Sequence, residues 1–274
     1  MFQNLFRNMS PVVKNLLILN VLFFVAQFAI SGFTDKLALR PILSDEFAPW
    51  QFASHFFMHS TASLMHIFFN MFALVMFGAQ LENRWGAKRF LIYYLSAAIG
   101  AAVIYQLYKY WDISQMTNFI NDFIQNPSSS LFAEFRANYV GSNSLTLDGK
   151  SMVYHIEELL NDPSTIKEGG LYAEALMNQF LEGKTNTPML GASGAVFGLL
   201  AAYGYLFPNT ELYLMFIPVP IKAKYFVMGY AAIELFSGIS NNPNDNVAHF
   251  AHLGGALVGI VMVIIWQRQK NQFF

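Results

Sequence analysis

Residues 189–207, MLGASGAVFGLLAAYGYLF, are almost wholly apolar. A helix of about this length, rising about 1.5 Å per residue, reaches across a bilayer core of roughly 30 Å. The whole chain is 55% hydrophobic and 12% charged, whereas soluble domains carry about 25% charged residues. We therefore expect an all-α polytopic membrane protein.

Ser193 lies near the start of this stretch, in the run Gly191-Ala192-Ser193-Gly194. One interpretation is helix packing, in which Gly194 and Gly198 form a small face for a neighbouring helix and the serine bonds to its own backbone. The other is a nucleophile, with glycines clearing space for a substrate backbone. Taken alone, the stretch favours helix packing. The other polar residues of the chain distinguish between packing and a nucleophile.

Six apolar segments of helical length follow one another along the chain. They lie at about residues 15–33, 61–79, 90–108, 189–207, 225–239 and 247–266. The polar, acidic residues between the third and fourth segments include stretches with helical apolar spacing, which predicts an extramembrane, mainly helical insert. The predicted organisation is helices 1–3 in residues 1–108, the insert in residues 109–187 and helices 4–6 in residues 188–274.

Basic residues fall on one side of the membrane if there are six spans. They are Arg7, Lys14, Arg84, Lys88, Arg89, Lys222, Lys224, Arg268 and Lys270. Because basic loops mark the cytoplasmic side, we expect both termini in the cytoplasm and the insert 109–187 outside. The net charge of −1 gives no sign of a nucleic-acid partner. The chain has no cysteine, which excludes disulfides and thiol catalysis.

Polar side chains inside the spans are costly in lipid, so each needs a reason. The candidates are His66, Asn70, Ser193, Glu234, His249 and His252. With six spans, the second, fourth and sixth helices all enter from the outside. His66, Ser193 and His252 then lie four or five residues in, roughly 6–8 Å below the outer surface at about 1.5 Å per residue. Three polar groups from distant segments are thus expected at one depth.

This arrangement predicts a serine–histidine pair. Small residues on the fourth and sixth helices would let their backbones approach closely, as two short side chains require. His252 would take the proton of Ser193 and pass it to the leaving amine, and His66 and Asn70 would donate to a developing oxyanion. No acidic residue is evident to orient His252, so a dyad is expected, with Phe197 packing on the imidazole.

Four motifs in order resemble those of the rhomboid family of intramembrane serine proteases, in its bacterial type. Gly191-Ala192-Ser193-Gly194 resembles the family's G-x-S-G, and His66 with Asn70 resembles its H-x-x-x-N. Residues 251–259 resemble A-H-x-x-G-x-x-x-G, and Glu82 with Gly86 resembles E-x-x-x-G. The resemblance implies a six-helix rhomboid bundle, Ser193 as nucleophile, His252 as base, and His66 and Asn70 on the oxyanion side. It also implies that a substrate helix enters beside the fifth helix.

The resemblance has departures, and it leaves some residues less defined. Trp50-Gln51 stands where the family often has W-R, and residues 109–187 are much longer than the usual loop. Gly191, Phe197 and His249 are further candidates for contact with the substrate. No cofactor is expected. No metal is expected either, since no carboxylate stands at a matching offset from His55 and His59.

The expected partners are transmembrane protein substrates and the lipid bilayer, and the expected location is the bacterial inner (plasma) membrane. Two alternatives stay open. One is a non-catalytic rhomboid-like protein that binds membrane clients, against which the presence of both Ser193 and His252 speaks. The other is a transporter or channel, which predicts a polar path across the whole bilayer rather than a cluster on one side.

Overall fold

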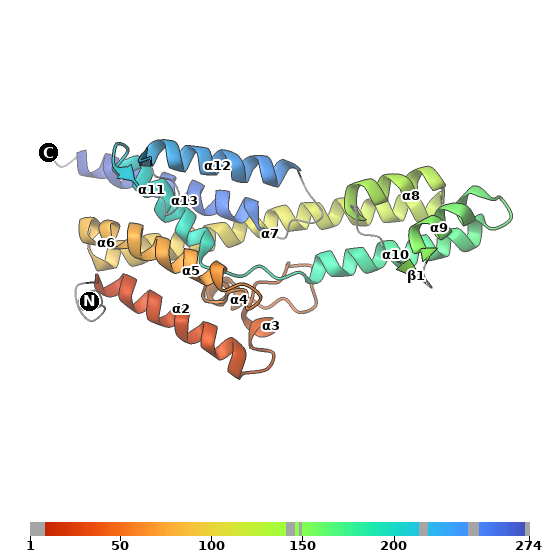
Figure 1. Ribbon diagram of the computed structural model, residues 1–274, viewed down its shortest axis with the longest axis horizontal. Coiled ribbons are helices and arrows are strands. Elements are labelled where there is room, and N and C mark those ends of the chain that lie inside the picture. The colour runs from red at the N-terminus through yellow and green to blue at the C-terminus, as the bar shows by residue number, and fades with distance from the viewer. Residues whose placement is uncertain (1–8, 141–145, 148–149, 214–218, 241–246, 272–274) are drawn as a thin grey trace.

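The computed structural model describes residues 9–140, 146–147, 150–213, 219–240 and 247–271. The protein is elongated, with a helical bundle at one end and a smaller group of helices at the other (Figure 1). The start of α2 and the end of α13 lie at the end of the bundle that faces away from the smaller group.

The bundle consists of long helices joined by shorter elements. Its helices are α2 (Pro11–Ala29), α5 (Leu64–Ala73), η2 (Leu74–Gly78), α6 (Ala79–Trp85), α7 (Ala87–Gln125), α11 (Ser193–Leu206), α12 (Ala223–Ser240) and α13 (His249–Asn271). Between α2 and α5 lie α3 (Phe33–Leu37), α4 (Gln51–Ser54) and η1 (His55–Phe57). A two-stranded antiparallel pair, β3 (Glu211–Leu212) and β4 (Ile221–Lys222), precedes α12.

Four helical stretches of the described residues are long and apolar enough to cross a membrane. They are Pro11–Ala29, Leu64–Trp85, Ala87–Gln125 and His249–Gln269. The apolar helix α11 is shorter, and α12 lies outside this set. The predicted class of a mostly helical, polytopic membrane protein is therefore confirmed, and the count of six spans stays a prediction.

Two helix boundaries differ from those expected. The helix predicted at residues 189–207 begins only at Ser193, because Gly191 has a φ of 119°, which is incompatible with a helix. Ser193 therefore lies in the first helical turn, not one turn into the helix. The third span continues past residue 108 as α7 without a break, since no glycine or proline interrupts the chain between Gly100 and Pro127.

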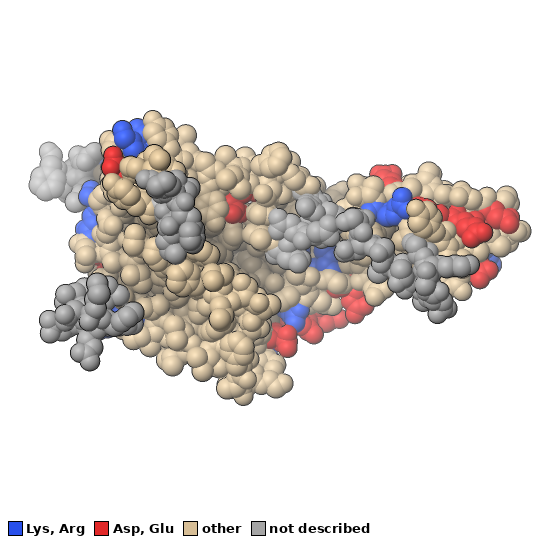
Figure 2. Space-filling model, in the orientation of Figure 1, with Lys and Arg blue, Asp and Glu red and all other residues tan. Residues whose placement is uncertain are grey.

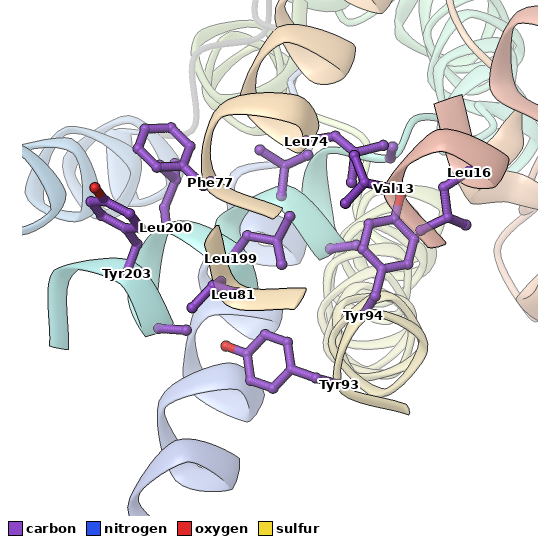
Figure 3. Packing of buried hydrophobic residues seen from close by; sticks show 14 of the residues in the cluster. Val13, Leu16, Leu74, Phe77, Leu81, Tyr93, Tyr94, Leu199, Leu200 and Tyr203 are labelled. Carbon is purple, nitrogen blue, oxygen red and sulfur yellow. The ribbon is translucent and has the colours of Figure 1, made fainter. Parts of the chain in front are cut away.

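Helix α11 is at the centre of the bundle. Every residue from Gly194 to Gly204 is buried. Figure 3 shows Leu199, Leu200 and Tyr203 of this helix in one apolar cluster with Val13, Leu16, Leu74, Phe77, Leu81, Tyr93 and Tyr94. The cluster fixes α11 against α2, η2, α6 and α7, so the residue at its first turn has a defined position.

Helices α11 and α13 approach each other backbone to backbone. A Cβ added to Gly255 would overlap the carbonyl oxygen of Gly194, and one added to Gly259 would lie 2.9 Å from Gly198 Cα. The hydroxyl of Tyr93 donates to the Gly198 carbonyl at 2.5 Å. The small faces predicted on these two helices are thus in contact, as the sequence analysis expected.

A methyl group at Gly255 is expected to separate the two helices. The atom in its way belongs to the backbone of Gly194, next to Ser193, and cannot rotate aside. We expect Gly255→Ala to destabilise the protein by about 1–3 kcal/mol, as overpacking does. The loss of stability is measured as a lower melting temperature in thermal unfolding of the protein in detergent. The matched control is Gly229→Ala on α12, where a Cβ meets nothing within 4 Å, and equal melting temperatures of the two variants would contradict the prediction.

Glu82 joins the start of α2 to α6. It is 3% exposed, and its two carboxylate oxygens accept the backbone N–H groups of Val12 and Val13, each at 2.9 Å. These amides belong to the first turn of α2 and have no acceptor in their own helix. Gly86, four residues on, ends α6 with a φ of 79°. The E-x-x-x-G pattern therefore has a structural role here.

The smaller group of helices contains most of the predicted insert. It comprises the end of α7 with α8 (Ser129–Phe135), η3 (Arg136–Val140), β1 (Thr146–Leu147), β2 (Lys150–Ser151), α9 (Met152–Asn161) and α10 (Ile166–Asn186). It has its own apolar core, which includes Phe123, Phe132, Phe135, Ile156 and Leu176. Acidic residues gather at its tip (Figure 2). The division of the chain at residues 108 and 187 stays a prediction, since α7 and α10 run between the two parts.

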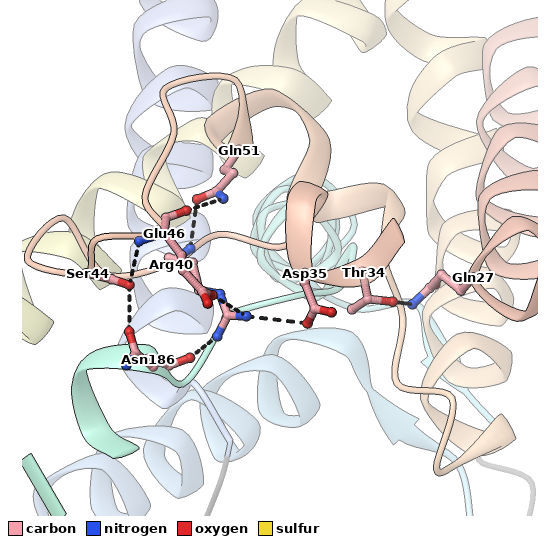
Figure 4. Close-up of polar contacts among 8 residues, drawn as sticks. All are labelled: Gln27, Thr34, Asp35, Arg40, Ser44, Glu46, Gln51 and Asn186. Carbon is pink, nitrogen blue, oxygen red and sulfur yellow. Dashed lines mark hydrogen bonds and ion pairs between the residues drawn. The ribbon is translucent and has the colours of Figure 1, made fainter. Parts of the chain in front are cut away.

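The segment after α2 is fastened to the end of α10 by Arg40 (Figure 4). The guanidinium lies 2.8 Å from the carboxylate of Glu46 and 3.4 Å from that of Asp35, and it donates to the carbonyl of Asn186. Gln51 is buried and accepts the backbone N–H of Arg40 at 3.0 Å. Where the family often has arginine after tryptophan, this chain thus uses an amide to hold the loop.

Candidate active site

Ser193 and His252 meet across the contact between α11 and α13. Ser193 Oγ lies 2.8 Å from His252 Nε2. Each residue lies in the first turn of its helix, and so does His66 in α5. The close approach at Gly194 and Gly255, one residue after Ser193 and three after His252, makes this short contact possible. The structure therefore brings together the serine and the histidine that the sequence predicts as a pair.

The ring of His252 is held on its other sides by two residues of the bundle. Phe197, one turn below Ser193 on α11, stacks on the imidazole with ring centroids 4.4 Å apart and an angle of 7°. Its packing on the imidazole was expected from the sequence and is confirmed. Glu234 of α12 accepts from His252 Nδ1, with Oε2 at 2.8 Å.

The expectation that no acidic residue stands beside His252 is therefore wrong. Glu234 is 4% exposed. It lies on α12, 18 residues before His252 in the chain, and its carboxylate faces α13. The signal in the sequence for this role is the presence of an acidic residue in an apolar span. The rotation of α12 about its axis, which the sequence does not reveal, decides that this carboxylate points at the histidine.

His249 lies one turn before His252 on the same helix. Its Nδ1 lies 2.7 Å from Oε2 of Glu234, so both histidines share one carboxylate oxygen. Among the described residues, Glu234, His249 and His252 form a group whose possible metal-ligating atoms lie within 4.8 Å of one another. The two hydrogen bonds account for that clustering.

His66 and Asn70 approach the serine from α5. His66 Nδ1 accepts the backbone N–H of Ser60 at 3.1 Å, so the ring proton is assigned to Nε2. A Cβ built on Gly191 would lie 2.8 Å from His66 Nε2 and 3.6 Å from Ser193 Oγ. Gly191 thus leaves open a space that a donor and the hydroxyl both border. Asn70 Nδ2 donates to the His66 carbonyl at 2.8 Å.

The side chains around Ser193 and His252 line a cavity of about 1670 Å³. Its lining includes Ser193, His252, His66, Asn70 and Gly191, and it continues along α7 and α10 to Asp112 and Lys184. Those two form an ion pair at 2.7 Å. The space beside the serine therefore extends from the bundle to the helices of the smaller group.

His55 begins η1 and His59 follows that element, and neither side chain is hydrogen-bonded to Ser193. Both are buried. The backbone N–H of Gly191 donates to the His55 carbonyl at 3.0 Å, and the His59 ring lies 5.2 Å from that of His66. Among the described residues, neither ring nitrogen of His59 has a hydrogen-bond partner. Burial lowers the pKa of His55 to about 4 and that of His59 to about 3.

Acidification is expected to destabilise the fold through these two histidines. The unfolded chain binds their protons below pH about 6.5, whereas the folded protein binds them only near the lowered pKa values, so stability falls as the pH is lowered from 6.5 towards 4. His59→Leu has a similar volume and no proton to bind. Its melting temperature should fall less between pH 7 and pH 4.5 than that of the natural protein, and an equal fall would contradict this.

Comparisons with known proteins agree with the motifs. A family model described as the Rhomboid domain matches residues 46–113 and 169–269, which is more than half of the chain. Residues 114–168, in the smaller group of helices, lie between the two matched parts. All the residues placed around the serine above fall within the match.

Three curated relatives are eukaryotic proteins. RHOMBOID-like protein 12, mitochondrial, of Arabidopsis thaliana is 26% identical over 211 residues, covering 76% of this chain and 44% of the relative. Rhomboid protein 1, mitochondrial, of Saccharomyces cerevisiae is 34% identical over 80 residues, 27% of this chain and 21% of the relative. An uncharacterized mitochondrial rhomboid protein of Schizosaccharomyces pombe is 33% identical over 90 residues, 31% of this chain and 23% of the relative.

The chain spans less than half of the length of these relatives. Because they carry mitochondrial names, they give no support to the predicted bacterial type. The family match and the apolar helices together identify the class of protein. The chain belongs to the rhomboid family of integral membrane proteins.

Proposed function

We propose that this protein is an intramembrane serine endopeptidase that cuts transmembrane proteins near the outer face of the membrane. The observation that supports it most is the 2.8 Å contact between Ser193 Oγ and His252 Nε2 in a large cavity. A packing serine needs no imidazole, and an imidazole placed for packing needs no open space beside the hydroxyl.

In the proposed reaction, Ser193 Oγ attacks the carbonyl carbon of the scissile peptide bond while its proton passes to His252 Nε2. The protonated imidazole then gives this proton to the nitrogen of the leaving chain, and the acyl-serine forms. A water molecule, activated by the same imidazole, hydrolyses the ester. Stacking on Phe197 holds the ring in line through both transfers.

The oxyanion of the tetrahedral intermediate would lie in the space that Gly191 leaves open. His66 Nε2 borders this space and carries the ring proton. The amide of Ser193, in the first turn of α11, has no acceptor in its own helix, and the positive end of that helix favours a negative charge there. Asn70 lies one turn below His66 and lines the same cavity, which supports a secondary role for it.

We infer six membrane spans, with α11 and α12 as the two added to the four long helices. Helix α11 is short because it begins at the site, below the surface, and its sides are buried in the bundle. The ends of α2, α6, α12 and α13 that carry basic residues lie at one end of the protein, and the acidic group of helices lies at the opposite end (Figures 1 and 2). This supports cytoplasmic termini and an external insert.

The membrane in which the protein works is open to test. The resemblance to bacterial rhomboids predicts a bacterial plasma membrane, whereas the relatives are named mitochondrial. The proposed chemistry is the same in both. Substrates should carry small or helix-breaking residues near the cut, since a continuous helix engages its own carbonyls.

The test is cleavage in proteoliposomes of single-span substrates whose outer ends carry or lack a glycine or proline. We expect cuts near the outer end of the substrates with these residues, mapped by mass spectrometry. Binding of the substrates without any cut, by protein shown to be folded, would favour the client-binding alternative and contradict the proposal. Ion flux through the same vesicles would favour a channel.

A further inference from the structure

Glu234 is the acidic residue of α12, and its side chain is buried. Only Ala223 and Glu234 of this helix are buried, and most of its large apolar side chains are exposed, including Met228, Ile233 and Phe236. A carboxylate inside an apolar bundle is costly unless it is paired and hydrogen-bonded. Among the described residues, the side chain of Glu234 is hydrogen-bonded to His249 and His252, which both belong to α13.

We propose that Glu234 is a positioning residue for His252, with His249 as the second donor that holds the carboxylate in place. The inference rests on the proposed function, because it concerns the histidine that would activate Ser193. It replaces the expected dyad by a chain of contacts from α12 through α13 to α11: Glu234, His252 and Ser193.

The geometry defines which proton His252 carries at rest. An ionised carboxylate only accepts hydrogen bonds, so the 2.8 Å contact from Nδ1 places the ring proton on Nδ1. The lone pair of Nε2 is then directed at Ser193 Oγ, 2.8 Å away. This is the tautomer that a general base for the serine needs. The alternative tautomer would turn an N–H towards the hydroxyl and could not take its proton.

The carboxylate also acts when the proton moves. Transfer from Ser193 Oγ to His252 Nε2 creates an imidazolium, with N–H groups at both nitrogens. Glu234 keeps its negative charge, takes no proton and stabilises the new positive charge at hydrogen-bond distance. His249, at 2.7 Å from the same oxygen, occupies a second acceptor direction of that oxygen and restrains the side chain of Glu234.

The test compares Glu234→Gln with the natural protein in the cleavage assay and in labelling of the serine by a phosphonate probe. Glutamine keeps the size and one acceptor but removes the charge. We expect kcat to fall at least about tenfold with KM little changed. The acidic limb of the pH–rate profile should move to lower pH, since the imidazolium loses its anionic neighbour. Tyr230 of α12 and His66 of α5 also face this group and are unchanged.

Glu234→Asp and Glu158→Gln serve as the matched variants. Aspartate keeps the charge on a shorter side chain, so its pH limb should stay near that of the natural protein even if its rate is lower. Glu158 is exposed on α9, and its amide variant should behave as the natural protein does. His249→Gln is expected to lower the rate less than Glu234→Gln, because His252 keeps its carboxylate.

Three results would overturn the inference. One is an unchanged pH limb and an unchanged rate per folded molecule in Glu234→Gln, which would leave Glu234 a purely structural role. The second result applies if Glu234→Gln fails to fold: it is an acidic limb that moves to lower pH in Glu234→Asp. Aspartate retains the negative charge, so the inference requires the limb to stay near its position in the natural protein. The third is loss of activity in a chelator with recovery on adding Zn²⁺, which would make the cluster a metal site.

These results are distinguishable from failure of the proposed function. If the natural protein shows no cleavage that depends on Ser193, then the endopeptidase proposal itself is wrong. If such cleavage is present and Glu234→Gln leaves it unaltered, only the role of Glu234 is wrong.

Discussion

Replacing Ser193 with alanine is expected to lower the rate of substrate cleavage by at least about 10³-fold without lowering the melting temperature. The hydroxyl is the proposed nucleophile, and it is hydrogen-bonded to His252 Nε2 at 2.8 Å. Its removal leaves a small space next to Gly191, and the packing of α11 below it is unaffected. Cleavage in proteoliposomes, normalised to folded protein, measures the effect.

A double variant that combines Ser193→Ala with His252→Gln tests whether the two residues act together. His252→Gln alone should cost about as much as Ser193→Ala, and the double variant should cost no more than either, because the pair acts as a unit. His155→Gln, exposed on α9, is the matched control and should cleave normally. Losses that multiply in the double variant would show two independent roles and contradict the pairing.

Replacing His66 with alanine is expected to lower kcat by about 10²-fold, with a small change in KM. The loss of one oxyanion donor has about this effect in well-studied serine proteases. The N–H of His66 Nε2 is directed to the side of the space beside Gly191, where charge develops only in the transition state. Asn70→Ala should cost less, because Asn70 Nδ2 already donates to the His66 carbonyl in its own helix.

The outcome of this series separates catalysis from binding. An increase in KM with unchanged kcat in His66→Ala would place the histidine in substrate binding, not in the oxyanion site. A decrease in melting temperature as large as that of Gly255→Ala would show that it mainly holds α5 in the bundle.

The sequence allowed much of the site to be predicted, because the chemistry depended on residue types in fixed helical positions. Ser193 and His252 could be paired because glycines one turn apart on two apolar helices predict backbone contact, and the structure shows that contact at Gly194 and Gly255. Phe197 could be placed on the imidazole by its spacing of one turn from Ser193.

What the sequence could not give was rotation, helix starts and loop paths. Glu234 is an acidic residue in an apolar span, but the sequence does not reveal which side of α12 faces α13. The start of α11 at Ser193 follows the positive φ of Gly191, whose N–H donates to the His55 carbonyl far away in the sequence. The path of the loop depends on long-range bonds of Arg40 to Glu46 and Asn186.

The central claim is that the hydroxyl of Ser193 is activated by the imidazole at its side. The most direct test is mass spectrometry of the protein after reaction with a serine-reactive phosphonate in detergent. We predict a single adduct on the peptide that contains Ser193 in the natural protein, and strongly reduced labelling in His252→Gln. An adduct on a different residue, or equal labelling of Ser193 without the imidazole, would contradict the account.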